Sequence, residues 1–193
     1  MIKIKNCALF GGTFDPFHNG HLHLVKSLLA AKKFENLVVI PSGNPYQKSG
    51  SASASDRLAM TKLALKDQAV AISDCEIDRA GPSYAVDTIK EIKDSIHADK
   101  YTWVLGSDAF AGLASWNRFQ ELTELVDFLV VIRPGTGVIS GIPGVRFEKI
   151  EIDALDISAT ELRNRIKQGE DVSPYLPVSV LSYIRENHLY GAA

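Results

Sequence analysis

A chain of 193 residues is long enough to bury a sizeable core, and its length predicts one domain over residues 1–193. Its 46% hydrophobic and 23% charged residues are typical of a soluble globular protein. A net charge of -2 excludes a strong overall attraction to nucleic acid or to an anionic membrane. No apolar run approaches membrane-spanning length, and no signal peptide is visible. We therefore expect a cytoplasmic protein whose anions are held by a local site.

Strand-like and helix-like stretches alternate along the chain. In chain order, the predicted elements are strand 2–10, helix 20–33, strand 37–40, helix 56–65, strand 69–77, helix 87–96, strand 103–105, helix 119–125 and strand 128–132. Short apolar strands that alternate with helices are typical of a parallel sheet covered on both faces. The sequence therefore predicts an α/β fold, with neither an internal repeat nor a linker between domains.

Two segments interrupt this alternation. Segment 42–55 is rich in serine, glycine and alanine, and segment 135–144 holds four glycines. Both compositions are typical of surface loops. Ligands of an open parallel sheet bind beyond the carboxyl ends of its strands, and segment 42–55 follows the second predicted strand. This segment is therefore also a candidate to close over a substrate and to bring Lys48 to bound phosphates.

The two cysteines, Cys7 and Cys75, lie far apart in the chain and near no histidine at metal-ligand spacing. Both occur in apolar stretches that predict strands. We expect both to be buried, reduced thiols, which fits a reducing compartment.

The strongest chemical signal is the stretch GGTFDPFHNGH over residues 11–21. Paired glycines after a strand, Gly11 and Gly12, allow backbone to approach a ligand closely. A helix that starts near His21 would direct its first amides and its positive dipole end at an anion. His18 and His21 could then bond phosphate oxygens. Zinc is the competing ligand, but no third metal ligand follows at suitable spacing, so no metal site is predicted. The remaining histidines are interpreted as ordinary ones: His23, His97 and His188.

A second signal follows near the C-terminus, over residues 157–163. Ser158 as an N-cap and Glu161 three residues later predict a capping box, and Gly169 predicts the end of that helix. Capping leaves Thr160 and Arg163 unexplained. A hydroxyl in the first turn and an arginine one turn later would suit a phosphate bound at the helix N-terminus.

The first stretch resembles the HxGH signature of the nucleotidylyltransferase superfamily, and the second resembles its ISxTxxR signature. Three further stretches, 78–88, 106–116 and 131–135, resemble the nicotinate-nucleotide adenylyltransferase family. The resemblance runs from about residue 7 to the C-terminal helix. It implies a Rossmann-like, doubly wound parallel sheet in a single nucleotidylyltransferase domain with a C-terminal helical segment.

Carried over residue by residue, the resemblance implies three groups of site residues. It implies catalytic roles for His18, His21, Lys48 and Arg163. It implies ATP binding by Gly11, Gly12, Thr13, Phe14, His18, His21, Gly106, Asp108, Ser158, Thr160 and Arg163, with residues 12–14 also lining the mononucleotide site. It implies substrate binding by Ser83, Tyr84, Ala85, Thr88, Trp116 and Arg133. The Trp116 indole would stack on a pyridine ring, since its face complements a flat cation.

The implied reaction joins nicotinate mononucleotide to the AMP part of ATP, with release of pyrophosphate, in NAD biosynthesis. The 5′-phosphate of the mononucleotide is already nucleophilic, so positioning and charge stabilisation would suffice. Mg²⁺ is expected on the ATP phosphates, without a dedicated cage of protein ligands. The expected partners are therefore ATP and nicotinate mononucleotide, and the oligomeric state is left open, a homo-oligomer included.

Three alternatives stay open at this point. The acceptor could be nicotinamide mononucleotide, or phosphopantetheine as in a sister family, which normally lacks the stretches around Tyr84 and Trp116. The chain could also be a catalytically silent nucleotide sensor of the same fold, against which both histidines and Arg163 argue. Three residues depart from the family pattern: Gln47 replaces a common histidine, Ala85 a common threonine, and Asn117 a common histidine or lysine.

Overall fold

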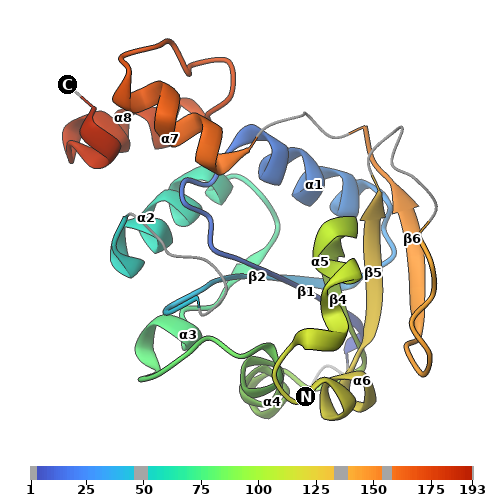
Figure 1. Ribbon diagram of the computed structural model, residues 1–193. Coiled ribbons are helices and arrows are strands. Elements are labelled where there is room, and N and C mark those ends of the chain that lie inside the picture. Colours follow the sequence, from blue (N-terminus) through green and yellow to red (C-terminus); the bar gives the residue numbers. More distant parts are fainter. Residues whose placement is uncertain (1–3, 46–51, 133–138, 154–157, 193) are drawn as a thin grey trace.

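The computed structural model describes residues 4–45, 52–132, 139–153 and 158–192. The strands of this part of the chain are β1 (Ile4–Gly12), β2 (Asn36–Pro41), β3 (Ala71–Ile72), β4 (Ala98–Gly106), β5 (Asp127–Ile132) and β6 (Phe147–Glu151). All pair in parallel in the order β3-β2-β1-β4-β5-β6 (Figure 1). This is the strand order of a doubly wound Rossmann-like sheet, so the predicted fold class is confirmed.

In the described part of the chain, helices lie in the connections from β1 to β5 and after β6. They are α1 (Asn19–Ala30), α2 (Ala54–Leu65), α3 (Cys75–Asp78), α4 (Ala85–Ser95), α5 (Ser107–Ala111), α6 (Phe119–Leu125), α7 (Ala159–Lys167) and α8 (Val178–Glu186), with 3-10 turns η1 (Leu113–Ser115) and η2 (Leu189–Gly191). The C-terminal helices α7 and α8 lie together near α1 and α2 (Figure 1). No helix of the described part is both long and apolar enough to cross a membrane.

Alternate strand residues build one core layer on each face of the sheet. Leu37 and Val39 of β2 face a layer shared with α1, α2, α7 and α8. Val38 and Ile40 face a second layer shared with α4, α5 and α6. Because both faces of the sheet are covered at β2, this strand consists of a continuous run of apolar residues, which is the pattern from which it was predicted.

The strand order reverses between β1 and β4. The chain moves outward from β1 to β3 and then returns to place β4 on the other side of β1. In such sheets, ligands bind outside the carboxyl ends of the strands at this reversal. The fold therefore directs attention to the residues that follow Gly12 and Gly106.

The strand predicted over 69–77 is mostly wrong. Only Ala71 and Ile72 pair with β2. The carbonyl of Asp74 then accepts bonds from the amides of Ile77 and Asp78 at 2.8 and 3.1 Å, so the chain winds into the short helix α3 instead. Cys75 therefore lies in a helix and is only half-buried, contrary to the expectation.

Three other local predictions met different outcomes. Cys7 is a buried free thiol on β1, as predicted. Ser158 lies at the N-cap of α7, but its side chain makes no capping bond, and Glu161 pairs with Arg165 one turn later, so the predicted capping box is wrong. Gly169 ends α7 with φ 72°, as predicted, and this left-handed conformation suits glycine.

Candidate active site

The glycine pair at the end of β1 is required by packing within the protein. A Cβ atom on Gly11 would lie 2.7 Å from Cζ2 of Trp103, and one on Gly12 would lie 2.5 Å from Cε1 of Phe14. A larger residue at either position would displace an aromatic ring. The Trp103 and Phe14 rings occupy the space that a Cβ atom would need, and the predicted approach of a ligand to this turn stays a prediction.

Phe14 turns the chain from β1 toward α1. Its φ of 50° is left-handed, which is uncommon for a bulky residue. Its ring is 2% exposed and packs against Phe10, Phe17 and His21 at centroid distances of 5.3, 5.1 and 5.0 Å. The ring is therefore part of the core. The Phe14 ring is not available to a ligand at this turn, whereas Thr13 is half-buried.

His18 and His21 stand together at the start of α1. Their rings stack at a centroid distance of 3.6 Å with 20° between the planes. His18 is the N-cap of the helix, and its backbone N–H donates to Nδ1 of His21 over 3.3 Å. Because that nitrogen accepts, the neutral His21 ring carries its proton on Nε2. The site therefore offers an imidazole N–H donor beside the first turn of α1.

The second motif reaches the first one through Arg163. Its Nη1 donates to the backbone carbonyl of Asp15 at 2.8 Å and lies 3.8 Å from the Asp15 carboxylate. Its Nη2 donates to the hydroxyl of Thr160 at 3.2 Å. Ser158 is exposed at the start of the same helix. The structure thus brings Thr160 and Arg163 to the loop that leads into His18.

Asp15 was not singled out from the sequence, although it lies within the first motif. Its side chain is 2% exposed. Oδ1 accepts a bond from the hydroxyl of Tyr190 at 2.7 Å and one from the amide of Ala52 at 3.2 Å. No local pattern near Tyr190 could have indicated this contact, because the two residues are 175 positions apart.

Arg57 is a second buried charge that the sequence argument missed. It is 2% exposed on α2, and its guanidinium donates to the carbonyls of Thr13, Ser42 and Gly43 at 2.8, 2.5 and 2.9 Å. Burial lowers the pKa of Arg57, and the nearby Asp15 carboxylate opposes that shift. Arg57 therefore joins the loops that follow β1 and β2. A signal existed, since helical spacing places it on the apolar face of α2.

The turn before α4 is joined to the end of β2. The amide of Ser83 donates to the carbonyl of Asn44 at 2.9 Å, and the amide of Asn44 donates to the hydroxyl of Ser83 at 3.0 Å. Tyr84 is the N-cap of α4, so the amides of Ala85 and Val86 belong to its first turn. The first amides of a helix have no acceptor within it and are suited to an anion.

Thr88 differs from the other predicted substrate residues. It is fully buried, and its hydroxyl donates to Oε1 of Glu76 at 2.6 Å. Arg79 in turn donates to the Thr88 hydroxyl at 2.9 Å. The side chain of Thr88 therefore holds α4 against α3, and it has no exposed surface for direct substrate contact.

The contacts of Trp116 and its neighbours place it near the carboxyl end of the sheet. Its ring meets Trp103 edge-on at 6.5 Å, and Trp103 is the ring that covers Gly11. Two residues later, Arg118 forms an ion pair with Asp87 in the first turn of α4. The segment that carries Trp116 is thus attached both to the glycine turn and to the helix that begins after Tyr84.

The remaining predicted residues fall into two groups. Gly106 and Asp108 are exposed where β4 ends and α5 begins, at the strand reversal. Lys48, Gln47 and Arg133 lie outside the residues that the structure describes. Within the described ranges, no group of three or more histidine, cysteine, aspartate or glutamate residues could hold a metal ion.

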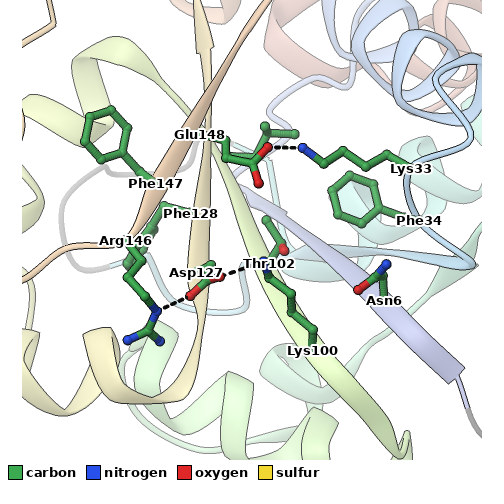
Figure 2. A pocket seen from close by; sticks show the side chains of 11 residues that line it. Asn6, Lys33, Phe34, Lys100, Thr102, Asp127, Phe128, Arg146, Phe147 and Glu148 are labelled. Carbon is green, nitrogen blue, oxygen red and sulfur yellow. Dashed lines mark hydrogen bonds and ion pairs between the residues drawn. The ribbon is translucent and has the colours of Figure 1, made fainter.

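A cavity of about 220 Å³ lies at the opposite edge of the sheet (Figure 2). It is bordered by the amino ends of β4, β5 and β6, and ion pairs line it. Asp127 accepts bonds from Arg146 at 2.6 Å and Lys100 at 2.8 Å, and Glu148 pairs with Lys33. None of the predicted site residues borders this cavity, so we do not assign the active site to it.

Comparison with known proteins agrees with the motifs. Residues 9–165 match the model of the Cytidylyltransferase-like family. A Leifsonia xyli subsp. xyli protein named "Probable nicotinate-nucleotide adenylyltransferase" is 35% identical over 185 residues, which cover 95% of this chain and 92% of that protein. A Streptomyces coelicolor protein of the same name is 37% identical over 184 residues, covering 93% and 98%. The chain belongs to the nicotinate-nucleotide adenylyltransferase family.

A solved structure shares the fold of this family member. Nicotinic acid mononucleotide adenylyltransferase of Plasmodium falciparum, complexed with NaAD, superposes with a TM-score of 0.82 over 98% of both chains. Its sequence identity is 19%, so the likeness is one of fold. The Rossmann-like architecture is therefore shared between chains whose sequences have diverged widely.

Proposed function

We propose that this adenylyltransferase family member is a cytoplasmic enzyme that transfers the adenylyl group of ATP to nicotinate mononucleotide. The products are nicotinate adenine dinucleotide and pyrophosphate, for NAD biosynthesis. The observation that carries the proposal is the meeting of the two phosphate motifs, in which Arg163 bonds the backbone of Asp15 just before His18. The names of the relatives support the same acceptor.

The ATP phosphates, which enter with Mg²⁺ bound to them, would lie at the N-terminus of α1. The first amides and the positive dipole end of that helix favour an anion. His18 and the Nε2–H of His21 would donate to the phosphate oxygens, whose charge grows as pyrophosphate departs. The 5′-phosphate oxygen of the mononucleotide bonds the α-phosphorus while the bond to pyrophosphate breaks. Positioned donors suffice for this step, and no covalent intermediate with the enzyme is needed.

The departing pyrophosphate would be held by α7. Arg163 and Thr160 already contact one another, and Ser158 lies exposed at the start of the same helix. An arginine guanidinium presents several donors in a fixed plane that matches phosphate oxygens. The pairing of Arg163 with the loop before His18 would place both ends of the breaking bond between fixed donors.

The nicotinate carboxylate would bind at the start of α4. In the turn formed by Ser83, Tyr84 and Ala85, the amides of Ser83 and Tyr84 already donate to backbone carbonyls, so the donors for a ligand would be the amides of the first turn of α4, at Ala85 and Val86. An N–H group donates a hydrogen bond and cannot accept one, so these groups match a carboxylate better than a carboxamide. Trp116 would stack on the pyridine ring. The attachment of its segment to α4 through Arg118 and Asp87 supports placing these groups on one ligand.

Other roles rest on the family resemblance together with position. We assign Gly106 and Asp108, exposed at the strand reversal, to the adenosine of ATP. Gly11, Gly12, Thr13 and Phe14 would contribute backbone surface at the β1 turn. Lys48 would reach the phosphates and Arg133 the mononucleotide, and both assignments come from the sequence alone.

Incubation with Mg·ATP and nicotinate mononucleotide tests the proposal. Pyrophosphate release should accompany one new dinucleotide, whose mass identifies it as nicotinate adenine dinucleotide. Phosphopantetheine in place of the mononucleotide should give neither product. Binding of ATP without any turnover would instead indicate a silent nucleotide sensor.

A further inference from the structure

Distant parts of the chain converge on the buried side chain of Asp15. The Tyr190 hydroxyl, from the 3-10 turn η2 near the C-terminus, donates to Oδ1 at 2.7 Å. The Ala52 amide, within segment 42–55 and just before α2, donates to the same oxygen at 3.2 Å. The guanidinium of Arg163 lies 3.8 Å from Oδ2. One carboxylate therefore connects the C-terminal turn with an arginine of the phosphate site.

The C-terminal segment is attached to the molecule without Tyr190. The backbone N–H of Asn19 donates to the carbonyl of Tyr175 at 2.8 Å, and its side-chain amide donates to the carbonyl of Pro174 at 3.0 Å. Helix α8 packs on α2, where the Tyr183 hydroxyl donates to Asp56 at 2.9 Å. Loss of one hydroxyl at Tyr190 should therefore leave the segment in place.

We propose that Tyr190 is a positioning residue for adenylyl transfer, which acts on the pyrophosphate group through Asp15 and Arg163. This inference rests on the proposed function. The Tyr190 hydroxyl and the Ala52 amide occupy Oδ1 of the carboxylate. They keep Asp15 from drawing the Arg163 guanidinium into a closer pair, so the guanidinium can bond phosphate.

The energetics of a buried carboxylate support the idea that the donors on Oδ1 keep Arg163 from a closer pair with Asp15. Asp15 is 2% exposed. A buried charge that loses a hydrogen-bond donor is strongly destabilised unless another donor takes its place. Arg163 is a charged donor that already lies within ion-pair distance of this carboxylate, at 3.8 Å. Burial raises the pKa of Tyr190, and its bond to Asp15 raises it further, so the hydroxyl keeps the proton that it donates.

Tyr190→Phe removes the hydroxyl and keeps the ring, and Tyr183→Phe is the matched control. Both replacements delete one tyrosine-to-aspartate bond of the C-terminal segment. For Tyr190→Phe, kcat/KM for ATP should fall roughly ten- to a hundredfold, the scale of one hydrogen bond to a charged group. The inhibition constant of pyrophosphate should rise by a similar factor, while KM for nicotinate mononucleotide changes less than about twofold if binding of that substrate is independent. Tyr183→Phe should lower Tm by about as much as Tyr190→Phe does, but it should leave these kinetic and inhibition constants unchanged.

A double-mutant cycle separates positioning from general destabilisation. In an Arg163→Ala background, Tyr190→Phe should cause almost no further loss of activity, since its target is already gone. Equal kinetic losses in both tyrosine variants, or full additivity with Arg163→Ala, would overturn the inference. So would a fully active Tyr190→Phe enzyme beside an active wild type. An inactive wild type with ATP and nicotinate mononucleotide would overturn the proposed function as well, which distinguishes the two failures.

Discussion

At the scale of single residues, the proposed chemistry depends on side chains that other side chains hold in place. His21 keeps its Nδ1 occupied by the backbone N–H of His18, and Phe14 and Phe17 enclose its ring. Asp15 and Arg57 are buried charges whose partners lie on the loops around the site. The sequence predicted the histidines, because their motif is local. It did not predict the buried charges, because their partners are distant in sequence.

We predict that His18→Ala and His21→Ala each lower kcat by roughly a hundredfold or more, as expected when a donor to a transition state is lost. Circular dichroism should show that both variants fold. His23→Ala, a half-buried histidine two positions later, is the control and should keep its activity. Full activity of both test variants, or stoichiometric bound zinc in the wild type, would contradict the assignment.

Replacement of Arg57 tests its structural role. Arg57→Met leaves three half-buried carbonyls without this donor, so the free energy of unfolding should fall by about 3 kcal/mol or more. Urea denaturation measures this loss. Lys62→Met on the same helix removes an exposed pair with Asp74 at 3.9 Å and should cost less than about 0.5 kcal/mol. Equal losses in the two variants would refute the role of Arg57.

Burial of Cys7 predicts a pH dependence of stability. Burial raises its pKa to about 11, whereas an unfolded thiol titrates near about 8.5. A raised pKa means that the stabilising contribution is complete below about pH 8.5 and is lost as the pH rises toward 11. Between pH 7.5 and 10.5, the free energy of unfolding of the wild type should therefore fall by about 2 kcal/mol more than that of Cys7→Ala. Urea denaturation under reducing conditions measures both values. Parallel curves for the two proteins would count against the burial argument.

At the scale of elements, hydrophobic periodicity predicted the helices and strands that bury a wide face. It failed where an element buries little. Strand β3 has two residues, and β6 carries exposed charged side chains between half-buried ones at the edge of the sheet. The capping box at α7 failed because Arg165 competes for the Glu161 carboxylate. Short-range contacts among polar side chains are therefore the weakest part of a prediction from sequence.

The segment around Trp116 offers a prediction at this scale. Its attachment to α4 through Arg118 suggests that both elements bind the same mononucleotide. Trp116→Ala should lower kcat/KM for the acid and amide mononucleotides by about the same factor, because stacking does not distinguish the two groups. Steady-state kinetics with both substrates decide this. A loss confined to the acid would place Trp116 at the carboxylate instead.

At the scale of the whole molecule, the fold joins the two ends of the chain at one site. The strand reversal exposes the turn after β1, and α7 and η2 return to it from 148 and 175 residues away. The class of sheet and the two motifs could be predicted from sequence, since each is a local pattern. The convergence on Asp15 could not, because nothing near Tyr190 encodes its partner.

The central claim is that this enzyme adenylylates the acid mononucleotide. Backbone donors at the start of α4 would face the NH₂ of the amide, at roughly 1–3 kcal/mol for each unpaired group. Because backbone supplies these donors, Ala85 in place of threonine should weaken the preference without abolishing it. We therefore predict that kcat/KM with Mg·ATP is at least about tenfold higher for nicotinate mononucleotide than for nicotinamide mononucleotide. Equal values, or faster turnover of the amide, would contradict the account.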